Sequence, residues 1–183
     1  MNQPYILYDS LIFDLQKFGG ISRYFCEIIS RLNVKYDISL YYTENYYLAQ
    51  SKICKHHLHI PGFLFKHFRY KFYRKNQKLT KKLLLSSSPY LFHPTYYDLT
   101  FLKYIGDNPF VITVHDMTYE RLPEYFSGAE GTIQLKKEII TKANRIIAIS
   151  ENTKKDIVEI LNIAPTKIDV IHHGTSIQPP LGR

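Results

Sequence analysis

The chain has 183 residues, a length that suits one domain with a hydrophobic core and is short for two. Hydrophobic residues make up 45% of it and aromatic residues 15%, which excludes a disordered chain. The net charge of +8 comes from one segment, because ten Lys and Arg residues and no Asp or Glu lie between Ser51 and Tyr97.

The first half of the chain predicts strands and helices in alternation. Residues 5–10 form a short and mostly apolar segment, as expected of a buried strand. Gly19 and Gly20 precede a helix over residues 21–32, whose apolar residues recur at helical spacing. A second strand is expected over residues 36–42.

A long helix follows over residues 63–85 and ends at three serines and a proline, 86–89. The residues that fit one apolar face of it are Phe65, Phe68, Phe72, Leu79 and Leu83. Four further strands are expected, at residues 91–93, 110–115, 145–149 and 167–171. Helices near residues 130–143 and after Ser150, which is a suitable N-cap, separate the last three.

This alternation predicts a three-layer α/β/α domain, Rossmann-like, with a mainly parallel sheet. We expect it to span residues 1–176, with residues 177–183 as the start of a linker. The N-terminus has no signal peptide pattern, and no window has the roughly 18–20 apolar residues of a membrane span. Cys26 and Cys54 are expected to be reduced thiols, and the chain to be cytoplasmic.

Polar residues follow nearly every predicted strand, where ligands of parallel sheets bind. These residues are Asp9, Ser10, His93, His115, Asp116, Ser150, Glu151, His172, His173 and Gly174. One such position is unremarkable by itself, but the full set indicates a polar rim along the carboxyl edge of the sheet.

The glycine pair before the first helix allows two interpretations. Backbone N–H groups at a helix N-terminus favour a phosphate, and Gly19 and Gly20 would let it approach closely. A glycine pair at this position is more often a tight turn, and neither G-x-G-x-x-G nor a P-loop is present.

His115 and Asp116 follow the most apolar strand and also allow two interpretations. The imidazole of His115 is suited to bind a substrate hydroxyl, with the Asp116 carboxylate orienting it. A histidine satisfied by backbone carbonyls fits equally well.

The remaining histidines do not have the regular spacing of a zinc site, and Cys54 is the one thiol near them. They are His56, His57 and His59, with His172 and His173 near the C-terminus. We expect no metal.

The basic segment has four possible roles: a solvated helix face, an anionic membrane surface, a site for a phosphorylated acceptor, or a nucleic-acid surface. Nucleic acid is the weakest of these, because no nucleic-acid fold pattern accompanies the segment. The candidate residues are Lys66, Arg69, Lys71, Arg74, Lys75 and Lys78.

Four ordered segments resemble family 4 glycosyltransferases, which are retaining enzymes of the GT-B fold. They are Phe18-Gly-Gly-Ile-Ser-Arg-Tyr24, Val114-His-Asp-Met-Thr-Tyr-Glu-Arg-Leu-Pro-Glu-Tyr-Phe126, Ala148-Ile-Ser-Glu-Asn-Thr-Lys-Lys-Asp156 and Lys167-Ile-Asp-Val-Ile-His-His-Gly174. The resemblance covers residues 5–176, and it implies two Rossmann-like domains facing a cleft, of which this would be the N-terminal, acceptor-binding one.

The resemblance also implies residue roles. Gly19 and Gly20 would approach the diphosphate of a sugar nucleotide, and His115 would contact sugar hydroxyls with support from Asp116. The residues that would border the cleft or acceptor are Arg23, Ser150, Glu151, His173 and Gly174. No metal cofactor is implied.

The family's C-terminal domain carries two glutamates, seven residues apart, and basic residues that hold the diphosphate. The sequence ends at Arg183, where that domain would begin, so we expect this chain to be inactive alone. The expected enzyme transfers a hexose such as mannose to a glycan or lipid-linked acceptor in cell-surface polysaccharide synthesis, peripherally at the inner face of the membrane. The alternative is a non-catalytic α/β module that binds membranes or acidic partners.

Overall fold

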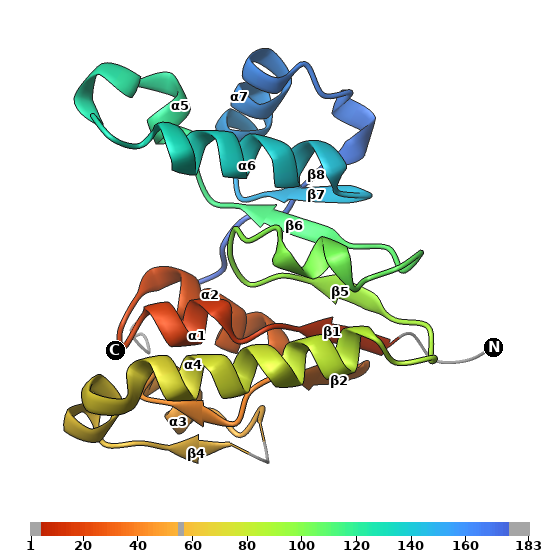
Figure 1. Cartoon of the computed structure of the whole chain (residues 1–183). Helices are drawn as coiled ribbons and strands as arrows, with labels where there is room; N and C mark the ends of the chain where they lie inside the picture. The colour runs from red at the N-terminus through yellow and green to blue at the C-terminus, as the bar shows by residue number, and fades with distance from the viewer. Residues whose placement is uncertain (1–4, 55–56, 176–183) are drawn as a thin grey trace, which may run out of the picture.

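A computed structural model describes residues 5–54 and 57–175; His56 and the expected linker, residues 177–183, lie outside these ranges. Six short parallel strands form an open sheet (Figure 1). Their bounds, in spatial order, are β2 Lys35–Ile38, β1 Tyr5–Tyr8, β5 Leu91–His93, β6 Val111–Val114, β7 Arg145–Ala148 and β8 Ile168–Val170. The predicted α/β fold with a mainly parallel sheet is confirmed.

The strand order reverses direction in the middle of the sheet. From β1 the chain moves outward to β2 and then returns to the other side of β1, where β5 lies. One parallel bridge, between Phe92 and Phe110, joins β5 to the β6-β7-β8 group. Crevices for ligands form at such a reversal, beyond the carboxyl ends of the strands.

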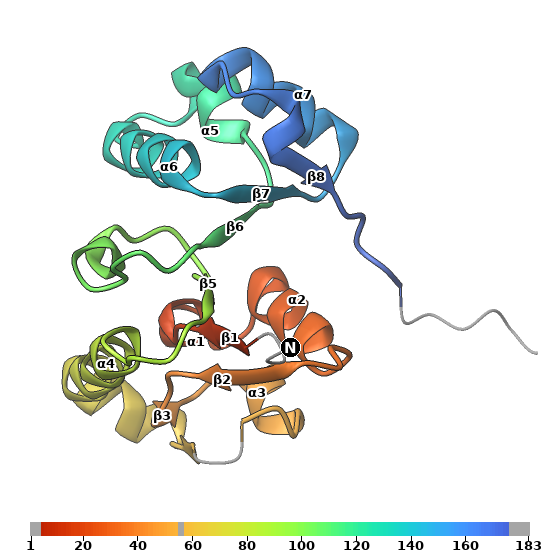
Figure 2. The same cartoon turned by 90° about the vertical axis from the view of Figure 1, so that its right-hand side faces the viewer.

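Helices cover both faces of the sheet, because successive side chains of a strand point to opposite faces. Leu7 of β1 belongs to one hydrophobic cluster and Tyr8, the next residue, to another. The Tyr8 cluster packs under α2 (Gly20–Ile29) and α3 (Tyr46–Gln50), and the Leu7 cluster under the end of α4 (Gly62–Leu84), α6 (Glu130–Lys142) and α7 (Glu151–Leu161). Figure 2 shows α2 and α3 on the side of the sheet opposite α4 and α6.

Several short elements were not predicted. They are α1 Leu11–Leu15, β3 Tyr42–Thr43, β4 Leu58–His59, α5 Thr118–Arg121 and the 3-10 turns Thr100–Lys103, Pro123–Tyr125 and Pro165–Lys167. The expected strand over residues 36–42 is wrong in its second half, because β2 ends at Ile38. The side-chain oxygen of Asn76 accepts the N–H groups of Tyr41 and Tyr42, which fixes the backbone there and leads it into β3.

The long helix α4 lies within one residue of its predicted bounds, and its predicted apolar face is right in part, because Phe65 is buried and Phe72, Leu79 and Leu83 are half-buried. Its buried side chains are Phe65, Asn76, Thr80 and Leu84, whereas Phe68 is partly exposed at a kink with φ −110° and ψ 16°. Asn76 and Thr80 are tolerated inside because both are hydrogen-bonded, Thr80 to Ser39 at 2.7 Å.

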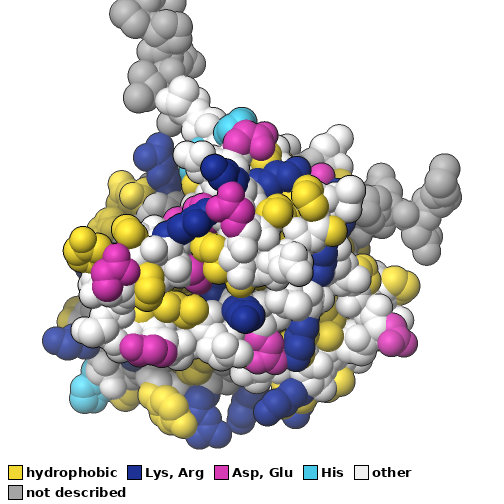
Figure 3. All heavy atoms as spheres, turned by 90° about the horizontal axis from the view of Figure 1, so that it is seen from above, with side chains coloured by type: hydrophobic (Ala, Val, Ile, Leu, Met, Phe, Trp, Pro, Cys, Tyr) yellow, Lys and Arg dark blue, Asp and Glu magenta, His cyan; other side chains and the backbone are white. Residues whose placement is uncertain are grey.

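No helix within residues 5–54 and 57–175 combines the length and apolar character needed to cross a bilayer. Cys26 lies on the buried side of α2, Cys54 is half-buried, and neither forms a disulfide. Figure 3 looks down on the face formed by the α5–α7 region, where acidic and basic side chains are interspersed.

Candidate functional site

A cluster of histidine, tyrosine and threonine side chains lies at the carboxyl edge of the sheet, near the reversal of strand order. Its members are Tyr24 of α2, His93 at the end of β5, Thr113 of β6, His115 just after β6, and His173 after β8. We call these five residues the histidine cluster. Three of the strand-end histidines predicted from the sequence therefore do come together.

Hydrogen bonds and ring contacts hold the cluster. The Thr113 hydroxyl lies 2.9 Å from Nε2 of His93 and 3.3 Å from the hydroxyl of Tyr24. The Tyr24 ring meets the His115 ring edge-on at 5.0 Å and lies 5.0 Å from the His173 ring. Tyr24 is thus in contact with both His115 and His173.

Burial keeps two of these histidines neutral. It lowers the pKa of His93 to about 3, with a smaller effect from the neighbouring His115. It lowers the pKa of His115 to about 4, helped by His173 and opposed by Asp116. A neutral imidazole has one N–H donor and one acceptor nitrogen, both suited to a hydroxyl group.

His115 also has an unsatisfied nitrogen. Its Nε2 atom is buried and has no hydrogen-bond partner among the described residues, a state shared only with Oε1 of Glu120. Buried polar atoms are normally paired, and an unpaired one in a native fold indicates a functional role or a missing ligand or water. The paired His93 nitrogen therefore supports structure, whereas His115 has capacity for a ligand.

Asp116, the predicted partner of His115, has a local structural role in its loop. Its side chain is exposed, and Oδ1 accepts the N–H of Thr118 at 3.0 Å. The backbone oxygen of Asp116 accepts a hydrogen bond from Nζ of Lys136 at 2.5 Å. Asp116 thus shapes the loop that carries His115.

Lys136 is the residue that anchors this loop, and the sequence did not single it out. Its side chain is only 5% exposed, and Nζ donates to Oε2 of Glu120 at 3.1 Å as well as to Asp116. The same ammonium lies 5.5 Å from the centre of the Tyr97 ring. No sequence signal marks this lysine, because its burial is visible only in the fold; once seen, the burial is informative, since lysine is almost never buried unless paired.

The two glycines at the start of α2 differ. Gly19 has an extended backbone, and a Cβ atom there would lie 2.0 Å from the amide oxygen of Gln16, which itself accepts the N–H of Ser22. Gly20 faces open space, and a Cβ atom there would have no neighbour within 4 Å. Gly19 therefore makes room for a capping side chain, and Gly20 leaves the surface open.

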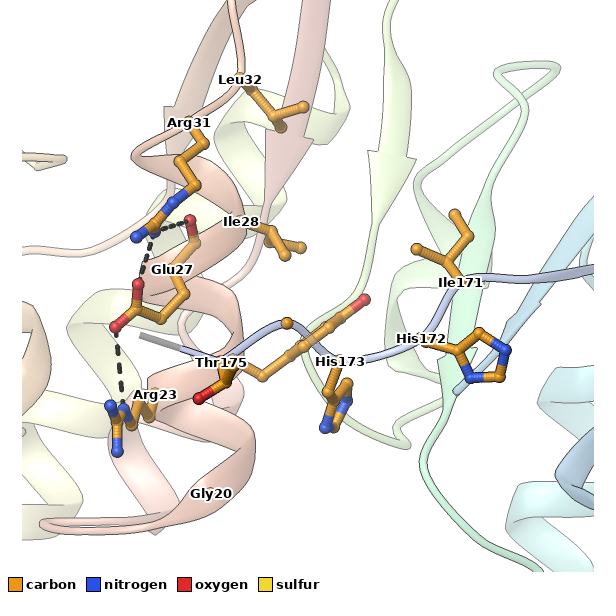
Figure 4. Close-up of a pocket in the computed structure, with 12 residues that line it drawn as sticks. Gly20, Arg23, Glu27, Ile28, Arg31, Leu32, Ile171, His172, His173 and Thr175 are labelled. Carbon is orange, nitrogen blue, oxygen red and sulfur yellow. Dashed lines mark hydrogen bonds and ion pairs between the residues drawn. The ribbon is translucent and has the colours of Figure 1, made fainter. Parts of the chain in front are cut away.

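A pocket of about 610 Å³ adjoins the histidine cluster (Figure 4). It lies between one side of α2 and residues 171–175, and both Tyr24 and His173 line it. Ile28 and Leu32 face Ile171 across its apolar part. The α2 residues that line it follow helical spacing from Gly20 to Arg31, a stripe that helical periodicity could have identified beside the buried one.

Two arginines and one glutamate form the polar wall of this pocket. Oε2 of Glu27 lies 2.5 Å from Arg31, and Oε1 lies 3.7 Å from Nε of Arg23. Glu27 thus bridges the predicted Arg23 and the unpredicted Arg31, as Figure 4 shows. The wall has a net positive charge.

The other predicted rim residues divide between structure and pocket. Ser150 caps α7, as predicted, by accepting the N–H of Thr153 at 3.1 Å. Glu151 is exposed at the first residue of that helix, and Gly174 lines the pocket. Asp9 is buried and accepts the N–H groups of Leu11 and Thr95, so it supports the fold.

The predicted basic residues lie on α4, apart from the histidine cluster. Within residues 5–54 and 57–175, no group of three His, Cys, Asp or Glu side chains could hold a metal ion.

One family of known proteins matches most of the chain. The sequence profile of Glycosyltransferase Family 4 matches residues 18–178, which include the whole histidine cluster and the pocket. No curated protein sequence matches the chain.

Proposed function

Because the chain belongs to glycosyltransferase family 4, we propose that it forms the N-terminal, acceptor-side half of a retaining GT-B enzyme. In this proposal the enzyme transfers a hexose, with mannose the first to test, from a sugar nucleotide to a glycan or lipid-linked acceptor in cell-surface polysaccharide synthesis. A second domain faces the carboxyl edge of the sheet and supplies most of the donor site.

The unpaired Nε2 atom of His115 is the observation that carries this proposal. Burial and the nearby His173 keep the imidazole neutral, so it binds a sugar hydroxyl without placing a positive charge in the site. Lys136 holds the backbone of Asp116 and so fixes the loop that directs His115. His115 acts as a binding and orienting group, with no covalent step at its nitrogen.

The open start of α2 is the proposed place of the donor diphosphate. A departing nucleoside diphosphate gains negative charge, which N–H donors and cations stabilise. Gly20 leaves the first turn of the helix accessible, and Gly19 admits the Gln16 amide that keeps this turn in place. Charge stabilisation here uses backbone groups and arginine, so the proposed mechanism needs no metal.

The acceptor lies in the pocket between α2 and residues 171–175. Arg23 and Arg31 make its wall positive, which suits an acceptor with a phosphate or another anionic group. His173 and Gly174 border it from the other side, and Ser150 and Glu151 border the cleft farther along the edge.

The test is sugar transfer by the native gene product, supplied with a panel of nucleotide-activated hexoses and a membrane extract as acceptor source. Release of nucleoside diphosphate and label in the product are measured for wild type and for His115→Gln. We expect the variant to lose about 100-fold in rate, the order found when one preorganised hydrogen bond to the reacting group is removed.

The exposed Lys137 of α6 gives the control, because Lys137→Gln introduces the same side chain away from both the site and α4. Its rate should stay near that of wild type. Equal activity of His115→Gln and wild type would refute the assigned role, and transfer by residues 1–183 alone would refute the need for a second domain.

A further inference from the structure

Large apolar side chains are exposed around the first half of α4. Two of them belong to α4: the exposed fraction is 75% for Phe63 and 72% for Tyr70. Leu58 of the neighbouring β4 is 61% exposed. Phe18 and Tyr46 are also exposed, with their ring centres 5.3 Å apart. These five residues are the apolar part of what we call the aromatic–cationic surface.

The five residues come from separate segments that contact one another. The N–H of Tyr46 donates to the backbone oxygen of Lys17, next to Phe18. Nζ of Lys17 lies 3.4 Å from where a Cβ atom would lie at Gly62, the residue before Phe63. On the other side, Leu58 pairs with Tyr42, which stacks on Phe72 of α4 at 4.8 Å. The surface is therefore continuous from the glycine turn across the start of α4 to β4.

Cations accompany these apolar side chains along α4. Phe63 and Lys66 lie before the kink at Phe68, and Tyr70, Arg74 and Lys78 recur every four residues along one side of the helix after it. Three more cations, Arg69, Lys71 and Lys75, flank this stripe. The sequence from Ser51 to Tyr97 contains no Asp or Glu, and Glu44 is the carboxylate that lies against Gly62.

Most of these cations lack a carboxylate partner in the described part of the chain. Arg69 is the exception, because its guanidinium donates to the backbone oxygen of Asp14 at 3.0 Å and its charge acts on the buried Asp14 carboxyl group. None of the six predicted basic residues of α4 forms an ion pair in the described part of the chain, whereas Arg121 and Arg145 on the α5–α7 side are paired with carboxylates. Instead, the guanidinium of Arg74 lies 5.6 Å from the Tyr70 ring and Nζ of Lys75 5.0 Å from the Tyr42 ring. Figure 3 shows how the opposite side mixes both charges.

We propose that this aromatic–cationic surface docks the protein on an anionic lipid bilayer. Aromatic and leucine side chains enter the headgroup region, and lysine and arginine attract anionic lipids above it. A single-stranded nucleic acid would use the cations and stack its bases on the aromatic rings, and an acidic protein would use the cations, but neither accounts for the exposed aliphatic side chain of Leu58. The apolar side chains therefore favour a membrane over these partners.

The position of the surface also names an acceptor class, and this part rests on the proposed function. Phe18 directly precedes Gly19 and Gly20, so the surface adjoins the turn that opens the pocket. In Figure 1 the start of α4 lies at the same edge of the molecule as α1 and α2. An acceptor anchored in the bilayer reaches this edge without leaving the membrane, which points to a lipid-linked acceptor.

Vesicle flotation tests the docking surface without donor or acceptor. Wild type should float with vesicles of phosphatidylcholine and phosphatidylglycerol in equal parts, less at higher salt, and not with phosphatidylcholine alone. Lys66→Gln with Lys71→Gln should weaken binding about 25-fold, from about fivefold per lysine. Lys35→Gln with Lys137→Gln removes the same charge elsewhere and should change binding less than about twofold.

A second pair of variants tests the apolar part. Phe63→Ser with Tyr70→Ser should reduce flotation, while Leu85→Ser with Tyr125→Ser, at equally exposed positions outside the surface, should not. Circular dichroism checks that all variants fold.

Absence of flotation with anionic vesicles at low salt overturns the proposal. An equal loss of vesicle binding in a double variant of the surface and in its control double variant also overturns it. Binding of single-stranded DNA or an acidic peptide that depends on Lys66 and Lys71, without vesicle binding, also overturns it. His115→Gln should float like wild type, so failure of sugar transfer and failure of docking are distinguishable.

Discussion

Two buried polar clusters in this protein differ in whether their hydrogen bonds are complete. Around Asn76, every polar group of the amide is used: its nitrogen donates to Asp14 and to the backbone oxygen of Tyr42, and its oxygen accepts two backbone N–H groups. In the histidine cluster, Nε2 of His115 is unpaired, and Oε1 of Glu120 is unpaired in the loop support behind it.

This difference distinguishes buried polar groups that stabilise the fold from buried polar groups that are available to bind a ligand. A complete cluster stabilises one arrangement of the elements around it, here α4 against α1 and β3. An incomplete cluster costs stability that the rest of the fold must supply, and such cost is expected where a ligand binds. The two clusters should therefore respond differently to substitution, pH and ligand.

The largest effect should come from breaking the complete cluster. Asn76→Ala leaves Oδ1 of the buried Asp14 and two part-buried backbone N–H groups without their partner, although Ser10 still donates to Oδ2, so we expect a loss of roughly 4–6 kcal/mol in the free energy of unfolding. Urea unfolding measures it. Gln77→Ala, one residue along the same helix, should cost less than about 0.5 kcal/mol. A small loss in Asn76→Ala would show that the cluster does not hold α4.

Breaking the support of the incomplete cluster should cost somewhat less. Lys136→Met leaves the Glu120 carboxylate buried and unpaired, a loss of about 3–5 kcal/mol. Adding Glu120→Leu removes that charge and should restore most of the stability, which a double-mutant cycle measures. If the double variant is no more stable than Lys136→Met, the ion pair is not the cause.

The pH dependence of stability distinguishes the clusters by sign. The folded-state pKa of His115, about 4, lies below its ordinary 6.5, so the unfolded chain binds a proton first as the pH falls. His115 therefore lowers the free energy of unfolding between about pH 6.5 and pH 4, by up to about 3 kcal/mol. Asp14 acts oppositely, because burial raises its pKa to about 7 and its ionisation destabilises the fold as the pH rises from about 4 to 7.

Urea unfolding of wild type and His115→Gln across this range isolates the histidine, because Asp14 contributes equally to both. The curves should converge toward pH 4 relative to pH 6.5, with wild type losing more. Parallel curves would mean that His115 titrates as it does in the unfolded chain.

The smallest effects should come from the glycine pair. Gly19→Ala displaces the Gln16 amide from the N–H of Ser22 and should cost about 1 kcal/mol, as loss of a helix cap does. Gly20→Ala meets no atom and should be neutral or stabilising by about 0.5 kcal/mol. In the transfer assay the order should reverse, because Gly20 borders the open pocket. Equal stability of both variants would contradict the distinction.

Much of the fold follows from local sequence pattern. The strands β6 and β7 are mostly apolar, and Ser150 marks the start of α7 as an N-cap. The buried face of α4 followed only in part, because Asn76 and Thr80 are stable inside only with partners from β3 and the end of β2, far away in the sequence.

The site residues that follow strands were predictable from the sequence, whereas those on helices were not. A parallel sheet brings the residues after its strands to one edge, which placed His93, His115 and His173 together. Tyr24 and Lys136 were missed because they lie on helices, where a tyrosine or a lysine is ordinary. Only the fold shows that Tyr24 meets two histidine rings and that Lys136 is buried.

The single bridge between Phe92 and Phe110 gives the sheet a seam. Across it, the N–H of Phe92 donates to Pro109, and the Phe101 ring packs against both phenylalanines. Amide exchange by local opening should therefore be faster here than within β1 or β7. His93 and Thr113 lie on opposite sides of the seam, so a ligand that tightens the histidine cluster should slow exchange at Phe92.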